Sequence, residues 1–356
     1  MSTSQRQIFP NVRALAQAAV PPLVGTLVID AEEDFDWNHP LRDTARSTEH
    51  LHDLTALAAL FARHRAVPTF LVTQPVLQDE AAVASLRALW ERGQCVLGLQ
   101  LHPWVTPPFG EVSSPRNSYL TNLDANQEEQ KLLTLKSLFE RRFGVAPTIF
   151  RAGRYGLSRN TPHLLEKHGF FIDTSIAPRT NFSRQGGPDY RHDDAGLFWF
   201  GAQRRLLEVP LCRDVVGWGS RFANGRIGLS DRLGPLGHAA GALFARTRCA
   251  ERITLSPEGN DVGAMQRLLR GLLARGQGVF SLSFHSSSLS PGRNPYVRDE
   301  AGQRVFIASL DAALAQMGDM LPGGFAPLDR VPFLLDPTVL PPRAQDSTAD
   351  IAASSV

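Results

Sequence analysis

The chain has 356 residues, of which 43% are hydrophobic and 20% charged, so it is long enough for one large domain or two ordinary ones. Its 37 basic and 35 acidic residues give a net charge of +2, a balance that does not indicate a nucleic-acid or anionic-membrane partner. The three cysteines are widely spaced without a CxxC pair, which predicts buried free thiols in a reducing compartment rather than a disulfide framework or a zinc knuckle.

Residues 1–22 are predicted to be a loosely ordered lead-in, because Pro21 and Pro22 interrupt their best apolar run. We expect no signal peptide and no membrane span, and hence a cytoplasmic protein. The chain then alternates between short β-branched apolar runs and amphipathic helical runs. The predicted strands lie at 25–29, 67–73, 95–101, 147–150, 170–173 and 278–284, and the predicted helices at 48–65, 79–93, 124–143, 161–169, 262–276 and 299–318.

The stretch 176–258 is less regular than the rest of the chain. Its predicted elements are a possible hairpin at 197–200 and 206–211, a helix of poor propensity at 231–247 and a strand with a loop at 252–259. After the last long helix, residues 325–335 predict a closing strand. The Pro-, Ala- and Ser-rich residues 336–356 predict a disordered tail.

Strands that alternate with helices indicate a parallel sheet. Seven or so such units favour a closed or nearly closed barrel over an open doubly wound sheet. No glycine-rich phosphate loop follows the first strand, which weighs against a nucleotide-binding fold. We therefore predict one barrel domain over residues 23–335.

A strongly polar residue follows each of several predicted strands. The first strand runs into LVIDAEEDFDW, where five carboxylates lie within seven positions, and such charge is costly unless a cation, an arginine or water meets it. Because residues just after the strands of a barrel converge on one face, we expect these side chains to meet. The five residues at such positions are Asp30, His102, Arg151, Asp173 and His285.

These residue types suit the hydrolysis of an acyl group. A carboxylate and a histidine can hold a divalent metal ion that lowers the pKa of a bound water and polarises a carbonyl. A second carboxylate can take the proton of that water, and a second histidine can protonate the leaving group. An arginine beside the base can keep it ionised and oriented.

Five strings in this order resemble the motifs of the NodB-homology polysaccharide deacetylases, which form carbohydrate esterase family four. The similarity is greatest to the branch labelled WalW, and it spans residues 25 to 300. It implies a distorted (β/α) barrel of the NodB-homology or glycoside hydrolase-deacetylase type. It also implies a metal-dependent hydrolase that removes an N- or O-acetyl group from a carbohydrate. The strings are IDAEEDFDW, QLHPWVTPPF, FRAGRYGLS, DTS and SFHSSSLSPGRNPYVRDE.

The resemblance also implies roles for single residues. Asp30 is similar to the catalytic base of the family and His285 to its general acid. Arg151 resembles the arginine that pairs with the base, and Asp173 resembles the aspartate of the fourth motif. Glu32 is our candidate metal ligand in the first motif, ahead of Glu33, and His102 is the ligand from the second motif.

The chain departs from the family pattern at two motifs. Ala31 stands where the family has a second aspartate, and Thr106 stands where it has a second metal-binding histidine. Gln100 offers only a neutral amide, which binds zinc less well than imidazole. The resemblance favours zinc, but this donor set leaves open weak zinc binding, another divalent ion, or none. The alternative function is a non-catalytic carbohydrate-binding protein with a degenerate metal site.

Four further residues are candidates for binding the substrate. Trp37 and Trp104 adjoin the predicted site and are either core residues or platforms for a sugar ring. Arg154 and Tyr155 could bind a substrate carboxylate or hydroxyl. A hydrolase acting on an amide outside a sugar remains a wider alternative. His50, near the first helix, is expected on the surface.

Overall fold

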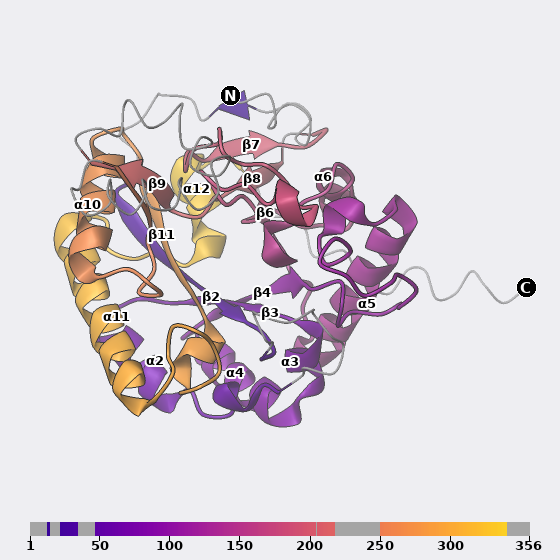
Figure 1. Cartoon of the computed structure of the whole chain (residues 1–356), viewed down its shortest axis with the longest axis horizontal. Coiled ribbons are helices and arrows are strands. Elements are labelled where there is room, and N and C mark those ends of the chain that lie inside the picture. The colour runs from indigo at the N-terminus through magenta and orange to yellow at the C-terminus, as the bar shows by residue number, and fades with distance from the viewer. Residues whose placement is uncertain (1–12, 15–21, 35–46, 204, 218–249, 340–356) are drawn as a thin grey trace, which may run out of the picture.

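The structure is a computed structural model that describes residues 13–14, 22–34, 47–203, 205–217 and 250–339 (Figure 1). Trp37, the predicted helix at 231–247, and most of the predicted lead-in and tail lie outside these residues.

A curled sheet of nine strands organises the chain, in the order β1-β7-β8-β6-β5-β4-β3-β2-β11. All neighbours from β8 to β11 are parallel, whereas β7 pairs antiparallel with both β8 and β1. The predicted barrel is therefore confirmed, and the predicted hairpin is β7 and β8. The strands are β1 Arg13–Ala14, β2 Val24–Ala31, β3 Thr69–Val72, β4 Val96–Leu101, β5 Ile149–Ala152, β6 Ile172–Asp173, β7 Phe198–Phe200, β8 Leu206–Glu208 and β11 Val279–His285.

Segments without regular secondary structure fill the gap in the barrel between β6 and β11. A second, two-stranded antiparallel sheet holds β9 (Arg213–Val216) and β10 (Glu251–Thr254). Backbone hydrogen bonds run from Leu211 N to Ile176 O at 3.0 Å, and from Leu255 N to Cys212 O at 2.7 Å. A third bond, from Ser283 N to Leu255 O at 3.1 Å, reaches β11. These bonds complete the barrel without a regular strand, which is why it is distorted.

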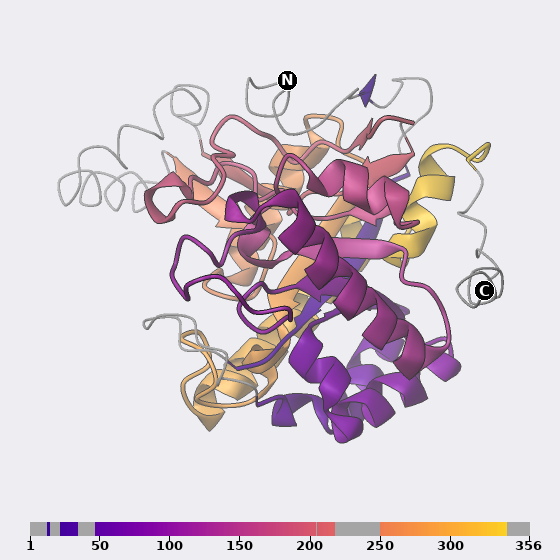
Figure 2. The same cartoon turned by 90° about the vertical axis from the view of Figure 1, so that its right-hand side faces the viewer.

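Helices cover the outside of the barrel (Figures 1 and 2). Local sequence sets their ends: Asp79 accepts hydrogen bonds from Ala81 N and Ala82 N at the start of α4, and Gly144 takes a left-handed conformation after α5. The helices predicted within the described residues are present, although the first begins at Thr55 rather than at residue 48, and the short helix α3 was not predicted. The helices are α2 Thr55–Arg63, α3 Gln74–Gln78, α4 Glu80–Glu91, α5 Ala125–Phe143, α6 Thr161–Lys167, α10 Val262–Leu273, α11 Glu300–Met320 and α12 Val331–Leu335.

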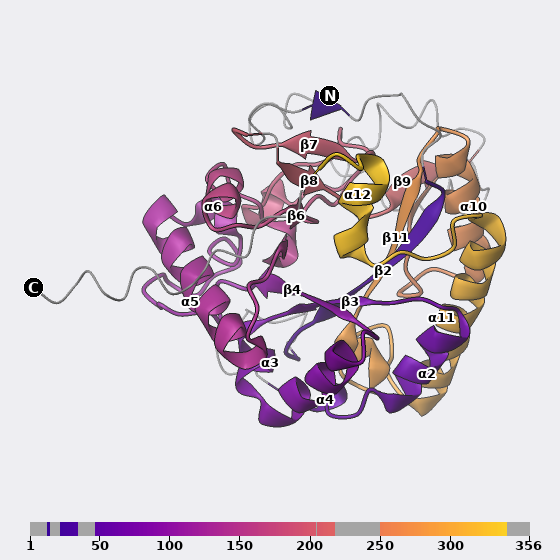
Figure 3. The same ribbon diagram turned by 180° about the vertical axis from the view of Figure 1, so that it is seen from behind.

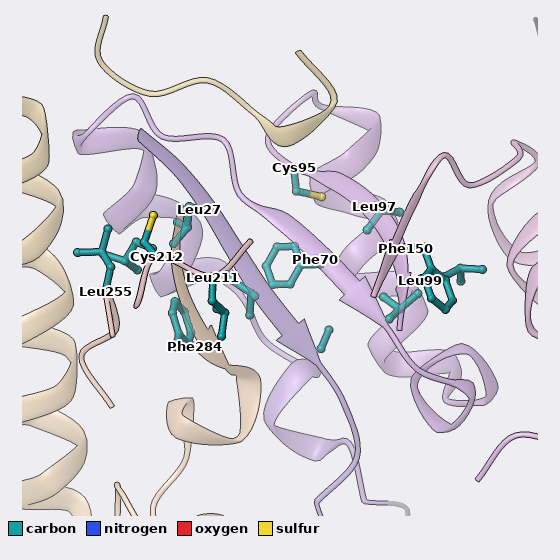
Figure 4. Packing of buried hydrophobic residues seen from close by; sticks show 14 of the residues in the cluster. Leu27, Phe70, Cys95, Leu97, Leu99, Phe150, Leu211, Cys212, Leu255 and Phe284 are labelled. Atoms are coloured by element: carbon teal, nitrogen blue, oxygen red, sulfur yellow. The ribbon is translucent and has the colours of Figure 1, made fainter. Parts of the chain in front are cut away.

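Two layers of apolar side chains follow the period of two along the strands. One layer lies between the sheet and the helices, where Figure 4 shows Leu27, Phe70 and Phe284 with the buried free thiols of Cys95 and Cys212. The other layer contains the alternate strand residues, including Val28, Leu71 and Ile172.

The predicted closing strand at 325–335 is wrong. This segment forms a turn and the short helix α12, and only Phe325 bridges Gly25 of β2. Pro332 lies in the first turn of α12, where its missing N–H costs nothing, whereas it would interrupt a ladder in a strand. Leu328 and Val331 instead pack in the second apolar layer. In Figure 3, α12 lies in front of the strands of the sheet.

Candidate active site

The candidate site lies at the carboxyl ends of neighbouring parallel strands. In the register of the sheet, His285 of β11 pairs with Asp30 of β2, and Gln100 of β4 pairs with Arg151 of β5. The predicted residues therefore meet because the sheet is parallel and their strands end at one edge.

An ion pair joins Arg151 to Asp30 in the barrel. Arg151 is only 1% exposed, and its Nη1 atom donates to Asp30 Oδ1 at 2.5 Å. Its other nitrogens donate to the backbone and the hydroxyl oxygen of Thr174, both at 3.0 Å. The face of Tyr155 lies 5.5 Å from the guanidinium. The arginine is thus fixed on several sides and holds the Asp30 carboxylate in one orientation.

Asp173 is fully buried and has different partners from those of Asp30. It accepts a hydrogen bond from Ser175, and in the sheet register it pairs with Glu208 of β8. Burial raises the pKa of Asp173 to about 6. Burial and the nearby Asp173 carboxyl raise the pKa of Glu208 well above its usual range. Asp173 is therefore part of a buried acid pair, while the ion pair of Arg151 is made with Asp30.

The two predicted metal ligands lie side by side. His102 Nε2 lies 3.4 Å from Glu32 Oε2, and both side chains are buried. Glu33 Oε1 lies 2.8 Å from His102 Nδ1, and Glu33 Oε2 accepts a hydrogen bond from Thr73 at 2.8 Å. Glu33 therefore orients the imidazole. Burial alone would lower the pKa of His102, but Glu33 and Glu32 raise it.

The donor atoms around Glu32 and His102 fall short of what a resident metal ion needs. Zinc sites in enzymes take three protein ligands, and no group of three His, Cys, Asp or Glu side chains suited to a metal occurs in the described part of the chain. The third side chain at this point is Gln100, whose Nε2 atom donates to Glu32 Oε2 at 3.1 Å and lies 3.1 Å from His102 Nε2. The donor set thus does not fit the predicted ion.

His285 faces the carboxylates from the neighbouring strand. Its Nε2 atom lies 3.8 Å from Asp30 Oδ2 and 4.0 Å from Glu32 Oε1, and 18% of its side chain is exposed. Its Nδ1 atom lies 2.8 Å from Glu258 Oε2. Burial alone would lower the pKa of His285, but the carboxylates of Glu258 and Glu32 raise it to about 10. The imidazole therefore carries a proton at neutral pH.

Glu32 is a strongly perturbed acid at this edge of the barrel. Burial raises its pKa to about 8, although the imidazoles of His285 and His102 act in the opposite direction. Its Oε1 atom is buried without a hydrogen-bond partner among the described residues. A buried carboxylate oxygen without a partner is costly, so this atom is available to a substrate or to water.

The residues predicted to bind substrate lie in different surroundings. Tyr155 lies over Arg151 at the site, whereas Arg154 donates to Ser118 Oγ at 2.6 Å and to Gln185. Trp104 is 7% exposed and stacks on His102 with ring centroids 4.2 Å apart, so one of its faces is covered by the imidazole. Substrate binding by these three residues stays a prediction.

Sequence reasoning missed two supports of the site. Glu258, in the loop after β10, accepts from the backbone of His285 at 2.9 Å and from Ser288 at 2.5 Å. Glu258 is an acidic residue that follows a predicted strand, and this position could have marked it as a candidate site residue. His50, expected on the surface, is buried, and its Nε2 lies 2.8 Å from the oxygen of Ser286. No signal in the sequence links these two residues, which are 236 positions apart.

Comparisons with known proteins identify the fold. A scan against family models gives no match to the chain, and a search of the curated proteins gives none either. Among solved structures, a probable polysaccharide deacetylase from Pseudomonas aeruginosa PAO1 superposes with a TM-score of 0.50 at 14% identity, over 88% of this chain and 91% of that one. Puue allantoinase superposes with a TM-score of 0.52 at 14% identity, over 92% of this chain and 95% of that one.

The fold is therefore a distorted barrel like that of the probable polysaccharide deacetylase and of the allantoinase. At 14% identity, the likeness concerns the fold. A search of the helices in the described ranges finds none with the length and apolar character needed to cross a bilayer.

Proposed function

We propose that this protein is a hydrolase that removes an acetyl group, held as an amide or an ester, from a carbohydrate. The observation that carries the proposal is the position of His285 Nε2, within 4.0 Å of carboxylate oxygens of both Asp30 and Glu32. A protonated imidazole and carboxylates at one edge of a barrel provide an acid and a base for the same reaction.

In this reaction Asp30 accepts a proton from the attacking water, and Arg151 keeps the Asp30 carboxylate oriented. The oxygen of that water bonds to the acetyl carbon, and the bond from this carbon to the sugar nitrogen or oxygen breaks. His285 gives its proton to the leaving atom, and Glu258 stabilises the charged imidazole. The products are acetate and the free amine or hydroxyl.

A carbohydrate substrate is supported by the sequence motifs that resemble NodB-homology deacetylases and by the fold neighbour described as a probable polysaccharide deacetylase. The second fold neighbour is an allantoinase, an enzyme named for a molecule that is not a sugar. This neighbour supports the wider alternative, in which the substrate is another amide. The WalW-like branch and a cytoplasmic location stay predictions from the sequence.

The test is acetate release from a panel of N- and O-acetylated sugars, with allantoin as a separate substrate. His285→Gln should reduce turnover by about 10²–10⁴ because the leaving group loses its proton donor. His163→Gln is the matched control, since His163 is exposed on α6 away from the strand ends. A His285→Gln variant with full turnover would show that His285 is not the acid.

A second candidate function is carbohydrate binding without catalysis. The observation that favours it is the amide of Gln100 beside Glu32 and His102, where the family pattern predicts a metal ion. Calorimetric binding of an acetylated oligosaccharide without any acetate release, with or without added divalent ions, would support this candidate over the hydrolase.

A further inference from the structure

The side-chain amide of Gln100 lies at the centre of the candidate site. Gln100 is buried on β4, two residues before His102. Its Nε2 atom lies 3.1 Å from both Glu32 Oε2 and His102 Nε2, and those two atoms lie 3.4 Å apart. Three polar side chains thus converge on one point inside the barrel, and only one of them is an amide.

The NH₂ end of the amide faces the other two groups, and its Oε1 atom is buried without a hydrogen-bond partner among the described residues. The Glu33 carboxylate at His102 Nδ1 accepts a proton from that nitrogen, so in the neutral ring Nε2 is an acceptor. An amide NH₂ group has two donors, and here each has an acceptor: the Glu32 carboxylate and the His102 ring. If the ring is charged instead, Nε2 donates to Glu32. In both states Glu32 Oε2 and His102 Nε2 are satisfied within the protein.

With a neutral His102 ring and an ionised Glu32, the opposite orientation would require a cation. Three donor atoms separated by about 3.0–3.4 Å could also surround one ion at ligand distances of about 2.1 Å. For that, Gln100 would have to turn its amide oxygen toward the carboxylate oxygen of Glu32. Without an ion, this rotation brings two acceptors together in a buried site, at a cost of about 1–3 kcal/mol for the unpaired groups. In this protonation state, Glu32 and His102 can be joined by the amide nitrogen of Gln100 or by an ion, but not by both.

We propose that the amide of Gln100 takes the place of a metal ion, so that this site is complete and active without one. The amide fixes Glu32 and His102 relative to each other, as a shared ion would, while Asp30 and His285 remain directed at the reacting atoms. This inference deepens the proposed function and depends on it for the reaction. Gln100 acts through its neighbours and is thus a positioning residue.

Metal binding tests the inference separately from turnover. Wild-type protein purified without chelator is assayed for metal content by mass spectrometry and titrated with Zn²⁺, Mn²⁺ and Co²⁺ by calorimetry. The same titrations are made on Gln100→His, which adds an imidazole between Glu32 and His102. Gln94→His is the control for nonspecific binding, because Gln94 is exposed in the turn before β4.

We expect wild-type protein to hold well below one equivalent of metal and any measured turnover to be unchanged by dipicolinate. We expect Gln100→His to bind Co²⁺ on the order of 100-fold more tightly than the wild type, with the visible absorption of a tetrahedral site. The inference is overturned if the wild type holds one equivalent of a divalent ion that Gln100→Ala loses. The wild-type measurements decide the question even if Gln100→His does not fold. Absence of acetate release with no metal bound would overturn the proposed function and with it the activity inferred here, but not the replacement of the ion by the Gln100 amide.

Discussion

His285 and Glu258 form one hydrogen-bonded unit, in which imidazole Nδ1 lies 2.8 Å from Oε2 and the His285 backbone N–H donates to Oε1 at 2.9 Å. Glu258 therefore controls both the orientation of the ring and its charge. The pKa of His285 is raised to about 10, against the effect of burial, chiefly by this carboxylate. A proton donor with a raised pKa stays charged to higher pH, so it extends activity on the alkaline side.

We predict that Glu258→Gln moves the alkaline limit of activity to lower pH by about 1–3 units, because the pKa of His285 falls when the carboxylate is removed. The measurement is the pH dependence of kcat/KM for both proteins. Glu300→Gln is the control, since Glu300 is exposed on α11. An alkaline limit that stays in place in Glu258→Gln would show that another group sets it.

The ion pair between Arg151 and Asp30 should be essential for folding stability. We predict that Arg151→Ala lowers the free energy of unfolding by about 3–5 kcal/mol, because it leaves the Asp30 carboxylate buried and unpaired. Arg304→Ala, which removes an exposed partner of Glu300, should change it by less than about 1 kcal/mol. Urea denaturation of both variants gives the comparison, and equal effects would show that Asp30 finds another partner.

The position of this ion pair could be predicted from the sequence. Asp30 and Arg151 each lie at the end of an apolar β-branched run, and a parallel sheet brings such ends to one edge. His102, Glu32 and His285 meet for the same reason. Their roles in catalysis and metal binding stay predictions, because the structure gives their positions and contacts alone.

Glu258 and His50 could not be placed in the same way. Glu258 follows β10, a short antiparallel strand outside the parallel series, and strand order does not tell where its loop folds. His50 is buried by contact with Ser286, and the two residues meet because they follow the paired strands β2 and β11, which are far apart in the sequence. The segment 325–335 was misjudged because its apolar residues suit a strand or a buried helix equally. Its prolines favoured the helix.

The buried acid pair of Asp173 and Glu208 should make stability depend on pH. Because their pKa values in the folded protein are raised, the protonated forms stabilise the fold. The contribution of protonated Asp173 to the free energy of unfolding is fully present below about pH 4, and it is lost as the pH rises through about 6. Glu208, whose pKa is also well above its usual range, continues the loss at higher pH.

We predict that Glu208→Gln is more stable relative to wild type at pH 8 than at pH 5, since the amide cannot ionise. The measurement is the free energy of unfolding in urea at both pH values, and Glu300→Gln is the control for an exposed glutamate. If the difference between Glu208→Gln and wild type is the same at pH 5 and pH 8, Glu208 does not titrate in this range.

A buried lysine, Lys131 of α5, holds the loop that follows His102. Its ammonium group donates to the carbonyl oxygens of Pro103 at 3.0 Å, Thr106 at 2.7 Å and Pro108 at 2.8 Å. It also pairs with Glu111 at 2.8 Å. This loop carries Trp104, which stacks on His102. Lys131 thus connects the outer helix to the ring beside the candidate site.

We predict that Lys131→Met lowers the free energy of unfolding by about 3–5 kcal/mol, because three carbonyls and the Glu111 carboxylate lose a buried cationic partner. Amide hydrogen exchange should accelerate over residues 103–111 more than over α5 itself. The matched control is Lys136→Met on the same helix, where an i,i+4 pair with Glu140 is worth only about 0.5 kcal/mol. If exchange over 103–111 is unchanged in Lys131→Met, the loop is held by its own contacts and the lysine does not position Trp104.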